Sequence, residues 1–241
     1  MQSGLYVSLS GQVALERRLE TIANNIANMN TAGFRADGVS FSAELAKAGE
    51  QQVAFASAGD TYITRGAGPL AKTDNPLDLA IQGDGWFGIQ TPNGIAYTRD
   101  GRMQMTETGA LQTVNGYQVL DAGGAPIGLD PNAGPPTISA DGMITQDGKQ
   151  ISAVGLFSIP DDAKLTRTVN SGVIPDKPAN PILDFTQNGV VQGSVEGSNV
   201  NPIMEMTKLI TVTRNFDSLS AAMSQSESSL QDAIKTLGGA T

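Results

Sequence analysis

Because the chain contains no histidine and no cysteine, acid–base or nucleophilic chemistry would have to rest on carboxylates or on lysine, serine, threonine and tyrosine side chains. Two carboxylates on expected turns are those of Asp84, in Gly83-Asp84-Gly85, and Asp100, in Asp100-Gly101. Trp86 and Tyr97 lie between them along the chain. Paired carboxylates could serve a glycosidase, and carboxylates on a loop could hold calcium. However, no EF-hand series of ligands closed by a glutamate is present, and Asp-Gly is a favoured two-residue hairpin turn. We therefore interpret the Asp-Gly pairs as turns, and we expect no catalytic residue, metal site or cofactor.

The aromatic residues of the same region allow a second chemical interpretation. Trp86, Phe87 and Tyr97 could line a sugar site, with their ring faces as platforms. They are also the largest apolar residues of two adjacent predicted strands in a region that has few aromatics, which favours a place in the core. Gly83-Asp84-Gly85 is not a phosphate-binding loop, because no Gly-Lys-Ser/Thr follows it. These residues therefore predict no active site.

The overall composition narrows the class of protein. The 241 residues include 15 lysines and arginines against 24 aspartates and glutamates, which gives a net charge of −9, and 5% aromatic residues. This balance argues against a phosphate-binding surface or stacking platforms, so nucleic acid is not an expected partner. The first residues lack a basic region, and charged residues follow at Glu16, Arg17, Arg18 and Glu20. We expect no membrane span and no secretory signal, and hence a protein that is cytoplasmic or exported without a cleaved signal peptide.

The C-terminal segment has the clearest periodicity in the chain. Apolar residues recur there at alternating steps of three and four, with one polar exception: Leu209, Val212, Phe216, Leu219, Met223, Ser226, Leu230, Ala233 and Leu237. This pattern spans four heptads of the narrow seam by which helices pair. Asn201 is the expected N-cap, Pro202 falls in the first turn, and Gly238 and Gly239 supply the stop. A helix of this length needs a partner along it.

A second amphipathic helix is predicted at the N-terminus. Its stripe also follows steps of four and three, and it consists of Leu15, Leu19, Ile22, Ile26 and Met29. We expect this helix to end near Asn30, where Asn-Thr-Ala-Gly supplies a stop. Because both stripes are narrow, they indicate helix pairing rather than packing on a broad core. The simplest arrangement brings the two ends of the chain together.

The middle of the chain is a different kind of structure, because all 12 prolines lie between Pro69 and Pro202. Short apolar runs alternate there with turn signals, which predicts antiparallel hairpins, and no helical crossover separates the runs as a parallel fold would require. The predicted fold class is therefore α+β, with a discontinuous coiled-coil domain of terminal helices and a central all-β antiparallel domain. We assign residues 1–30 and 200–241 to the helices, 31–75 to an extended connector, and 76–199 to the central domain.

Four asparagines near the end of the first helix need an explanation, since asparagine is a poor helix former. A C-cap accounts for Asn30 alone. Asn24 and Asn28 share one face beside the apolar stripe, where their amides could bond to neighbouring chains. We favour this interface interpretation over fraying. The candidate assembly interface combines both helices and consists of Leu15, Leu19, Ile22, Asn24, Asn25, Ile26, Asn28, Met29, Leu209, Val212, Phe216, Leu219, Met223 and Leu230.

Three stretches of the sequence resemble the signatures of the bacterial flagellar rod and hook proteins. The first runs from Ala23 to Arg35 and contains Ala-Asn-Asn-Ile-Ala-Asn-Met-Asn-Thr-Ala-Gly-Phe-Arg. The second runs from Leu77 to Phe87 and continues in Tyr97-Thr98-Arg99-Asp100-Gly101, and the third runs from Glu196 to Pro202 and on through Met206 to Phe216. They occur in the family's order over nearly the whole chain. Within the family, the length, the single middle domain and Trp86 are most similar to the proximal rod proteins.

The resemblance implies a structural subunit of the basal-body rod, the axial drive shaft that transmits motor torque. It implies a periplasmic location, export through the flagellar type III apparatus, and partners among other rod subunits, the distal rod protein foremost, and copies of the chain itself. It implies no catalytic residue and no cofactor.

Two alternatives belong to other classes of protein. A periplasmic cell-wall hydrolase or glycan-binding protein associated with the rod would use the acidic turns near Trp86, but it would need two carboxyls across a cleft, one of them in apolar surroundings. The acids of this sequence cluster instead on expected hairpin tips. An export or capping chaperone would not need helical seams at both ends with a β domain between them.

Overall fold

The structure is a computed structural model that describes residues 2–48, 51–57 and 59–239, without the side chains of residues 2–6, 43–48, 51–56 and 230. The chain divides into two compact units, each assembled from separate stretches of sequence. The helical unit consists of residues 1–27, 37–62 and 201–241, and the β unit consists of residues 28–36 and 63–200. The backbone therefore passes back and forth between the two units.

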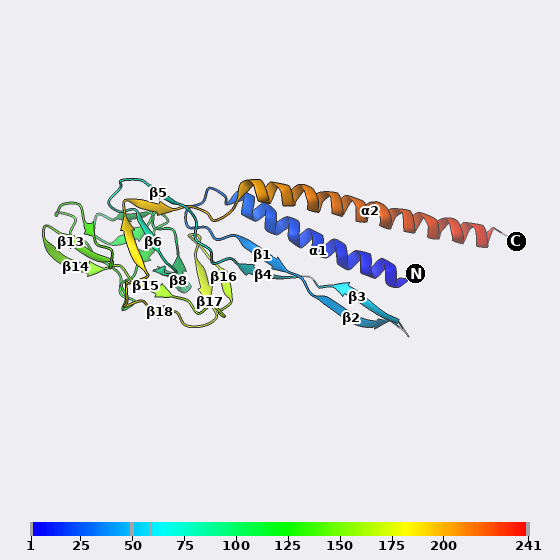
Figure 1. The fold of residues 1–241 in the computed structure, drawn as a ribbon, viewed down its shortest axis with the longest axis horizontal. Coiled ribbons are helices and arrows are strands. Elements are labelled where there is room, and N and C mark those ends of the chain that lie inside the picture. The colour runs from blue at the N-terminus through cyan, green and yellow to red at the C-terminus, as the bar shows by residue number, and fades with distance from the viewer. Residues whose placement is uncertain (1, 49–50, 58, 240–241) are drawn as a thin grey trace. The chain divides into compact units, whose positions relative to one another are not determined.

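Two long helices occupy the ends of the chain (Figure 1). α1 spans Gln2–Ala27 and α2 spans Pro202–Gly238. The side-chain oxygen of Asn201 accepts hydrogen bonds from Ile203 N and Met204 N, both at 3.1 Å, which confirms the predicted N-cap. Over the part of the chain that is described, neither helix combines the length and apolar character needed to cross a membrane.

The two helices run antiparallel within the helical unit. Asn25, near the end of α1, donates from Nδ2 to Glu205 Oε2 at 3.3 Å, near the start of α2. Farther along, Gln12 Nε2 donates to Ser220 Oγ at 3.1 Å. The pairing joins residues at opposite ends of the sequence within one chain.

Strands complete the helical unit over residues that we expected to form part of an extended connector. β1 (Asp37–Ser40) pairs with β4 (Asp60–Ile63), and β2 (Ala43–Ala48) pairs with β3 (Gln51–Ala56). β1 and β3 also contact α1. The sequence pattern did not reveal these strands, because their residues are mostly small or polar and strand formation depends strongly on what a segment packs against.

The β unit contains the remaining strands. They are β5 (Leu70–Lys72), β6 (Leu79–Gln82), β7 (Trp86–Thr91), β8 (Gly94–Thr98), β9 (Met103–Met105), β10 (Leu111–Thr113), β11 (Gln118–Val119), β12 (Thr137–Ile138), β13 (Met143–Gln146), β14 (Lys149–Ala153), β15 (Leu156–Ser158), β16 (Leu165–Arg167), β17 (Val173–Pro175), β18 (Asn180–Pro181), β19 (Gly189–Gln192) and β20 (Ser194–Glu196).

The largest sheet of the β unit has the strand order β16-β17-β8-β7-β11-β10-β9, and β15 pairs with both β7 and β18. β12, β13 and β14 form a three-stranded sheet, while β6 pairs with β19 and β5 pairs with β20. The pairings between these strands are antiparallel. The prediction of an α+β protein with terminal helices and a mostly antiparallel middle is confirmed, whereas coiled-coil geometry remains a prediction.

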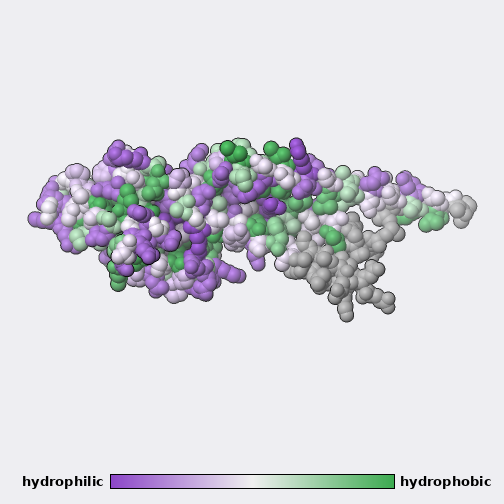
Figure 2. Space-filling view, in the orientation of Figure 1, coloured by the Kyte–Doolittle hydropathy of each residue, from purple (hydrophilic) through white to green (hydrophobic). Residues whose placement is uncertain are grey.

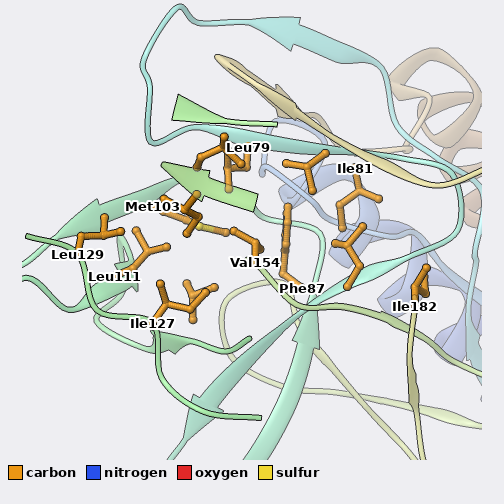
Figure 3. Close-up of a cluster of buried hydrophobic side chains, with 14 residues drawn as sticks. Leu79, Ile81, Phe87, Met103, Leu111, Ile127, Leu129, Val154 and Ile182 are labelled. Carbon is orange, nitrogen blue, oxygen red and sulfur yellow. The ribbon is translucent and has the colours of Figure 1, made fainter. Parts of the chain in front are cut away.

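The hydrophobic core of the β unit is drawn in Figure 3. Its buried members are Leu79, Ile81, Phe87, Met103, Leu111, Val119, Ile127, Leu129, Ile138, Ile144, Val154, Leu156, Ile182 and Val190. A second cluster contains Ile63, Trp86, Ile159, Ala163 and Val173, with Tyr97 packed against it. Trp86 is 3% exposed and Phe87 is fully buried, so the prediction that these rings belong to the core is confirmed.

The Asp-Gly pairs do not all have the same role. Asp147 and Gly148 join β13 to β14 with φ of +50° and +75°, the left-handed conformation that a two-residue hairpin turn requires, which confirms the prediction there. The expectation of a hairpin tip at Asp100 is wrong, because this residue is 1% exposed. Gly101 passes so close to β6 that a Cβ atom would lie 1.6 Å from the carbonyl oxygen of Leu79. The glycine is required there by the close approach of two backbones.

Candidate functional site

A buried cluster of three charged side chains in the β unit joins the three stretches that carry the family resemblance. Arg35 comes from the first stretch, Arg99 from the second, and Glu196, the last residue of β20, from the third. Arg35 Nη1 lies 2.6 Å from Glu196 Oε1, and Arg99 Nη1 lies 3.1 Å from Glu196 Oε2. The three side chains are between 0% and 2% exposed. One carboxylate therefore balances two guanidinium groups in the protein interior.

Trp86 contributes the aromatic surface of this cluster. The guanidinium carbons of Arg35 and Arg99 lie 5.8 Å and 5.5 Å from the centre of the indole ring. A cation within about 6 Å of an indole face is attracted by its quadrupole, and the attraction strengthens when the pair is desolvated. The only tryptophan of the sequence is thus a second partner for both arginines.

The charge of the cluster is incompletely balanced. The pKa of Arg99 is lowered to about 10, chiefly by burial and also by the nearby positive charge of Arg35, while Glu196 acts in the opposite direction. Burial also lowers the pKa of Arg35, again against the effect of Glu196. Arginine remains protonated at pH 7. Two positive charges therefore depend on one buried negative charge, with added support from the exposed Asp84.

Glu196 also organises the backbone around it. Its Oε1 accepts a hydrogen bond from Gly68 N at 2.8 Å, and its carbonyl oxygen accepts from Gly33 N at 2.8 Å. Gly33 has φ of +66°, and a Cβ at this position would lie 2.2 Å from Asp100 N. The glycine of the first stretch is therefore explained by both its conformation and the space around it.

Asn199, three residues after Glu196, extends the same network. Its backbone N donates to Phe34 O at 3.2 Å, and its Oδ1 accepts from Ala36 N at 2.7 Å. Its Nδ2 donates to Thr64 Oγ1 at 3.0 Å and to Gly66 O at 2.7 Å. The segments bound in this way are those in which the backbone enters or leaves the β unit. The arrangement fastens chain segments to one another, and it presents no exposed group that could react.

The carboxylates considered for hydrolysis are not arranged as a catalytic pair. Asp100 Oδ1 and Oδ2 accept hydrogen bonds from Arg102 Nε and Nη2 at 2.9 Å and 2.8 Å. Asp100 is thus buried in an ion pair rather than in apolar surroundings, while Asp84 is exposed on its turn. Within the described residues, no group of three acidic, histidine or cysteine side chains could hold a metal.

A cavity of about 400 Å³ lies beside the charged cluster, with Trp86 and Arg99 in its lining. Arg65, on another part of the lining, already donates to the carbonyl oxygens of Ile159, Pro160 and Ala163. Arg99 Nη1 and Nη2 donate to Glu196 and to the carbonyl oxygen of Gly83, so these bonds of both arginines stabilise the walls of the cavity.

The candidate interface residues of the helices fall into five groups. Ile22, Asn25 and Val212 are buried in the helical unit. Leu15, Leu19, Ile26, Leu209, Phe216, Leu219 and Met223 are partly buried in the same unit, and Asn24 is exposed. Asn28 and Met29 are partly buried and belong to the β unit. The side chain of Leu230 lies outside the described residues.

Asn25 makes its hydrogen bonds within the chain. Its Oδ1 accepts from Asp37 N at 2.8 Å, and its Nδ2 donates to Asp37 O at 2.9 Å and to Glu205. The side-chain amide of Asn25 thus bonds to both the N–H and the C=O of Asp37 in β1, as the backbone of a neighbouring strand does in an antiparallel pair. Glu205, which is 6% exposed and forms an ion pair of 2.6 Å with Lys208, was missed by the sequence analysis. Its position four residues after the N-cap, between apolar neighbours, was the available signal.

Family comparisons match three parts of this chain. Residues 5–35 match the model for flagella basal body rod proteins, residues 80–146 match the D1 domain of the flagellar hook protein FlgE/F/G, and residues 191–236 match the C-terminal model of flagellar basal body rod FlgEFG proteins. Each matched region contributes one member of the buried cluster: Arg35, Arg99 and Glu196.

Named relatives cover essentially the whole chain. The flagellar basal-body rod proteins FlgF of Mesorhizobium japonicum and of Rhizobium meliloti are each 51% identical to it, over 99% of both chains. The flagellar basal-body rod protein FlgG of Bacillus subtilis is 33% identical, over 97% of this chain and 98% of its own length. The chain belongs to the flagellar basal-body rod protein family. Its similarity is greater to these FlgF proteins than to this FlgG protein.

Proposed function

We propose that this protein is a structural subunit of the flagellar basal-body rod and that it assembles with other rod subunits. The observation that carries the proposal is the 51% identity with FlgF proteins over 99% of both chains. The location is the basal body of the flagellum, and the protein is not an enzyme. The buried and paired state of Glu196 and Asp100 supports a mechanical role, since neither carboxylate is available for hydrolysis.

The apolar helical surfaces support assembly through α1 and α2. Several large apolar side chains of these helices are exposed in the single chain: Leu9, Val13, Ile203, Met204, Met206, Ile210, Ile234 and Leu237. Exposed apolar side chains that repeat along a helix are characteristic of surfaces that pack against other helices. We propose a coiled-coil type of packing in which the seam residues of both helices, from Leu15 to Ile26 in α1 and from Leu209 to Leu230 in α2, contribute to contacts between subunits as well as within one.

The partners in this proposal are other rod subunits, with the distal rod protein foremost, and further copies of the chain. We also propose periplasmic assembly after passage through the flagellar type III export apparatus. Torque transmission then requires that each β unit be stiff. The network around Glu196 and Asn199 supports this requirement, because it fastens the segments by which the backbone enters and leaves that unit.

The proposal is tested by deleting the gene and restoring it with an epitope-tagged copy. We expect the deletion to abolish swimming and the tagged chain to be recovered in purified basal bodies by mass spectrometry. Phe216→Asp should be exported but absent from basal bodies, because it places a charge in the helical seam. Asn215→Asp introduces the same group at the preceding, exposed position and is the matched control. Normal rods without the chain, or basal bodies that lack the tagged chain in swimming cells, would contradict the proposal.

A further inference from the structure

A second, smaller cavity of about 230 Å³ lies within the β unit, and it is lined almost entirely by polar side chains. Asn28 and Thr31 of the first family stretch belong to its lining, and so does Asp100 of the second. The connection between β16 and β17 forms another part of the wall. Phe34 is the apolar member of the lining. Asn28, a residue of the predicted assembly interface, thus lies at a polar cavity.

The charges of this lining are unequal, because it contains Arg102 and Arg167 but Asp100 as its acid. Asp100 is already occupied: Oδ1 accepts from Arg102 N at 3.2 Å and from Nε at 2.9 Å, and Oδ2 accepts from Nη2 at 2.8 Å. Arg167 Nη2 donates to Arg35 O at 2.6 Å, and its guanidinium carbon lies 4.2 Å from the ring centre of Phe34. The chain therefore holds both guanidinium groups in place and leaves one positive charge in excess in the lining.

Two side chains of the cavity have hydrogen-bond donors that the described residues do not use. A guanidinium group carries five N–H donors, and the pair with Asp100 uses two of those of Arg102, whose side chain is 43% exposed. Asp78, outside the lining, attracts this guanidinium more weakly than Asp100 does. Asn170 is 8% exposed, and its Oδ1 accepts from Asn115 Nδ2 at 2.6 Å, but its Nδ2 has no partner among the described residues. Leaving a buried donor without an acceptor is unfavourable, so an oxygen in the cavity would stabilise this amide.

The lining distinguishes between classes of ligand. A metal ion is not suited, because the oxygens of Asp100 already accept three hydrogen bonds from Arg102. An apolar group would meet Phe34, whose ring is covered by Arg167. A carboxylate does fit, since its single negative charge equals the excess of the lining and its two oxygens match the planar fork of an arginine. A phosphate dianion carries more charge than the lining balances.

We infer that this cavity is a binding site for a carboxylate group. The carboxylate accepts from the remaining N–H donors of Arg102 and from Asn170 Nδ2, with the hydroxyl groups of Thr168 and Ser171 as further donors in the lining. Two sources supply this chemistry: an acidic side chain of another rod subunit, and a free organic acid. Hydrophilic residues cover much of the β unit on the face that Figure 2 shows, so a neighbour would meet polar groups there. The side-chain source rests on the proposed function, whereas the site itself does not.

The test titrates the purified, ¹⁵N-labelled full chain with sodium acetate at pH 7 and constant ionic strength. Nuclear magnetic resonance follows the Nδ2 signal of Asn170, which is assigned as the side-chain signal lost in Asn170→Gly. Glycine suits this position, where φ is +58°. We expect the signal to shift and to saturate with acetate. Acetamide has a similar shape without the charge and is the control ligand; it should give no saturable shift, and inorganic phosphate should bind more weakly than acetate.

A substitution at Arg102 tests the role of the arginine fork. Arg102→Lys keeps a positive charge beside Asp100 but removes the planar pair of donors, so the dissociation constant of acetate should rise about tenfold, as expected for loss of one charge-assisted hydrogen bond. Arg214→Lys, at an exposed position of α2, is the matched control and should leave the constant unchanged. An absent shift of the Asn170 signal in the unaltered chain, or an equal response to acetamide, would overturn the inference. Equal constants in the two folded variants would also overturn it.

Purified basal bodies distinguish the two sources of the carboxylate. Asn115→Lys places an amine at the exposed edge of the cavity, where a water-soluble carbodiimide joins it to a carboxylate within reach. A cross-link from position 115 to an aspartate or glutamate of another chain, above the background at the exposed Lys149, assigns the carboxylate to a neighbouring subunit. Saturable acetate binding without this cross-link assigns the site to a free organic acid. Recovery of the chain in basal bodies tests the proposed function separately, so either result can fail without the other.

Discussion

The two units of this protein place their apolar and charged residues in opposite ways. The β unit buries a large cluster of apolar side chains and, in addition, a network of two arginines and one glutamate. In the helical unit, the buried apolar side chains among those described are Ile22 and Val212, while large apolar residues such as Ile203 and Leu237 are exposed. The β unit therefore completes its core within one chain, whereas the helical unit leaves large apolar side chains exposed.

Under the proposed function, this difference would let one chain be exported before it assembles and still form part of a stiff rod. Helices that bury little apolar surface gain less from tertiary packing than a sheet with a large core, so we expect the helical unit to be the less stable of the two units in a free monomer. A subunit whose helices gain stability mainly on docking would remain unassembled until it meets its neighbours. The β unit, in contrast, must hold its shape before and after assembly. The ion pairs of Glu196 with Arg35 and Arg99 join separate segments of that unit, so its fold depends on these few side chains.

The largest effect is expected from removing the shared counter-ion in the β unit. Glu196→Gln leaves Arg35 and Arg99 without a buried negative charge, and breaking such a pair costs about 3–5 kcal/mol. The free energy of unfolding is measured in urea by the fluorescence of Trp86, the only tryptophan, which lies against both arginines. A protein that is already unfolded without urea would also agree with this expectation.

The matched control for this variant is Glu107→Gln, the same substitution at an exposed position of the same unit. Its unfolding free energy should change by less than about 0.5 kcal/mol, as is usual for surface substitutions. If the two variants unfolded at the same urea concentration, the buried cluster would not be what separates the β unit from the helical unit.

The fold could be predicted from the sequence where local signals are strong. Heptad spacing and the cap at Asn201 identified α2, and the Asp147-Gly148 turn identified a hairpin. The strands of residues 37–62 had no such signal. β1 depends on the amide of Asn25 and on β4, which are contacts that no local pattern in residues 37–40 reveals.

The buried cluster could not be predicted because a sequence does not show which charges are buried. Arginine and glutamate are seldom fully buried, so each of the three residues would be expected on the surface. They are also far apart along the chain; Arg99 and Glu196, for example, are separated by 97 positions. Each of the three stretches that carry the family resemblance contains one of these residues, but only the fold brings the three side chains together. Asn25 was included in the predicted interface between subunits, and its intrachain bonds to Asp37 were not foreseen.

The next largest effect is expected in the helical unit. Val212→Asp buries a carboxylate between α1 and α2 and should destabilise their pairing by about 3 kcal/mol, within the range for a buried polar group that lacks a partner. The helical signal in circular dichroism should then be lost at lower urea, while the Trp86 fluorescence transition of the β unit stays unchanged. Thr213→Asp, at the adjacent exposed position, is the control. A matching shift of both signals would show that the two units unfold as one.

A smaller effect is expected from a methyl group added where two backbones meet in the β unit. Gly101→Ala would bring a Cβ atom to 1.6 Å from the carbonyl oxygen of Leu79, and relief of such overpacking costs about 2 kcal/mol. Gly128→Ala in the same unit meets no atom within 4 Å and is the matched control. Urea unfolding followed by Trp86 fluorescence compares the two. Equal stability would mean that residues 99–101 can shift without disturbing the core.

The smallest effect concerns the pH dependence of the β unit. Burial raises the pKa of Tyr97, whose ring packs edge-on against Phe157 at a centroid distance of 5.4 Å. The unfolded chain therefore loses the phenolic proton first as the pH rises above about 10, the ordinary value for tyrosine. Because the folded state then binds more protons than the unfolded state, the contribution of Tyr97 to the free energy of unfolding is complete below that pH and is lost as the pH rises through the folded-state pKa.

Tyr97→Phe keeps the ring and removes the titrating proton. The unfolding free energy of this variant should therefore fall less steeply with pH than that of the unaltered protein between about pH 9 and 11. The pKa of Arg99 is lowered to about 10, chiefly by burial, so the titration of this arginine makes the unfolding free energy rise with pH in the same range. The contribution of Tyr97 is therefore obtained from the difference between the pH slopes of the variant and the unaltered protein. Identical slopes would show that this edge of the β unit is open to water, as the helical unit is, and that the contrast between the units is confined to the cluster around Glu196.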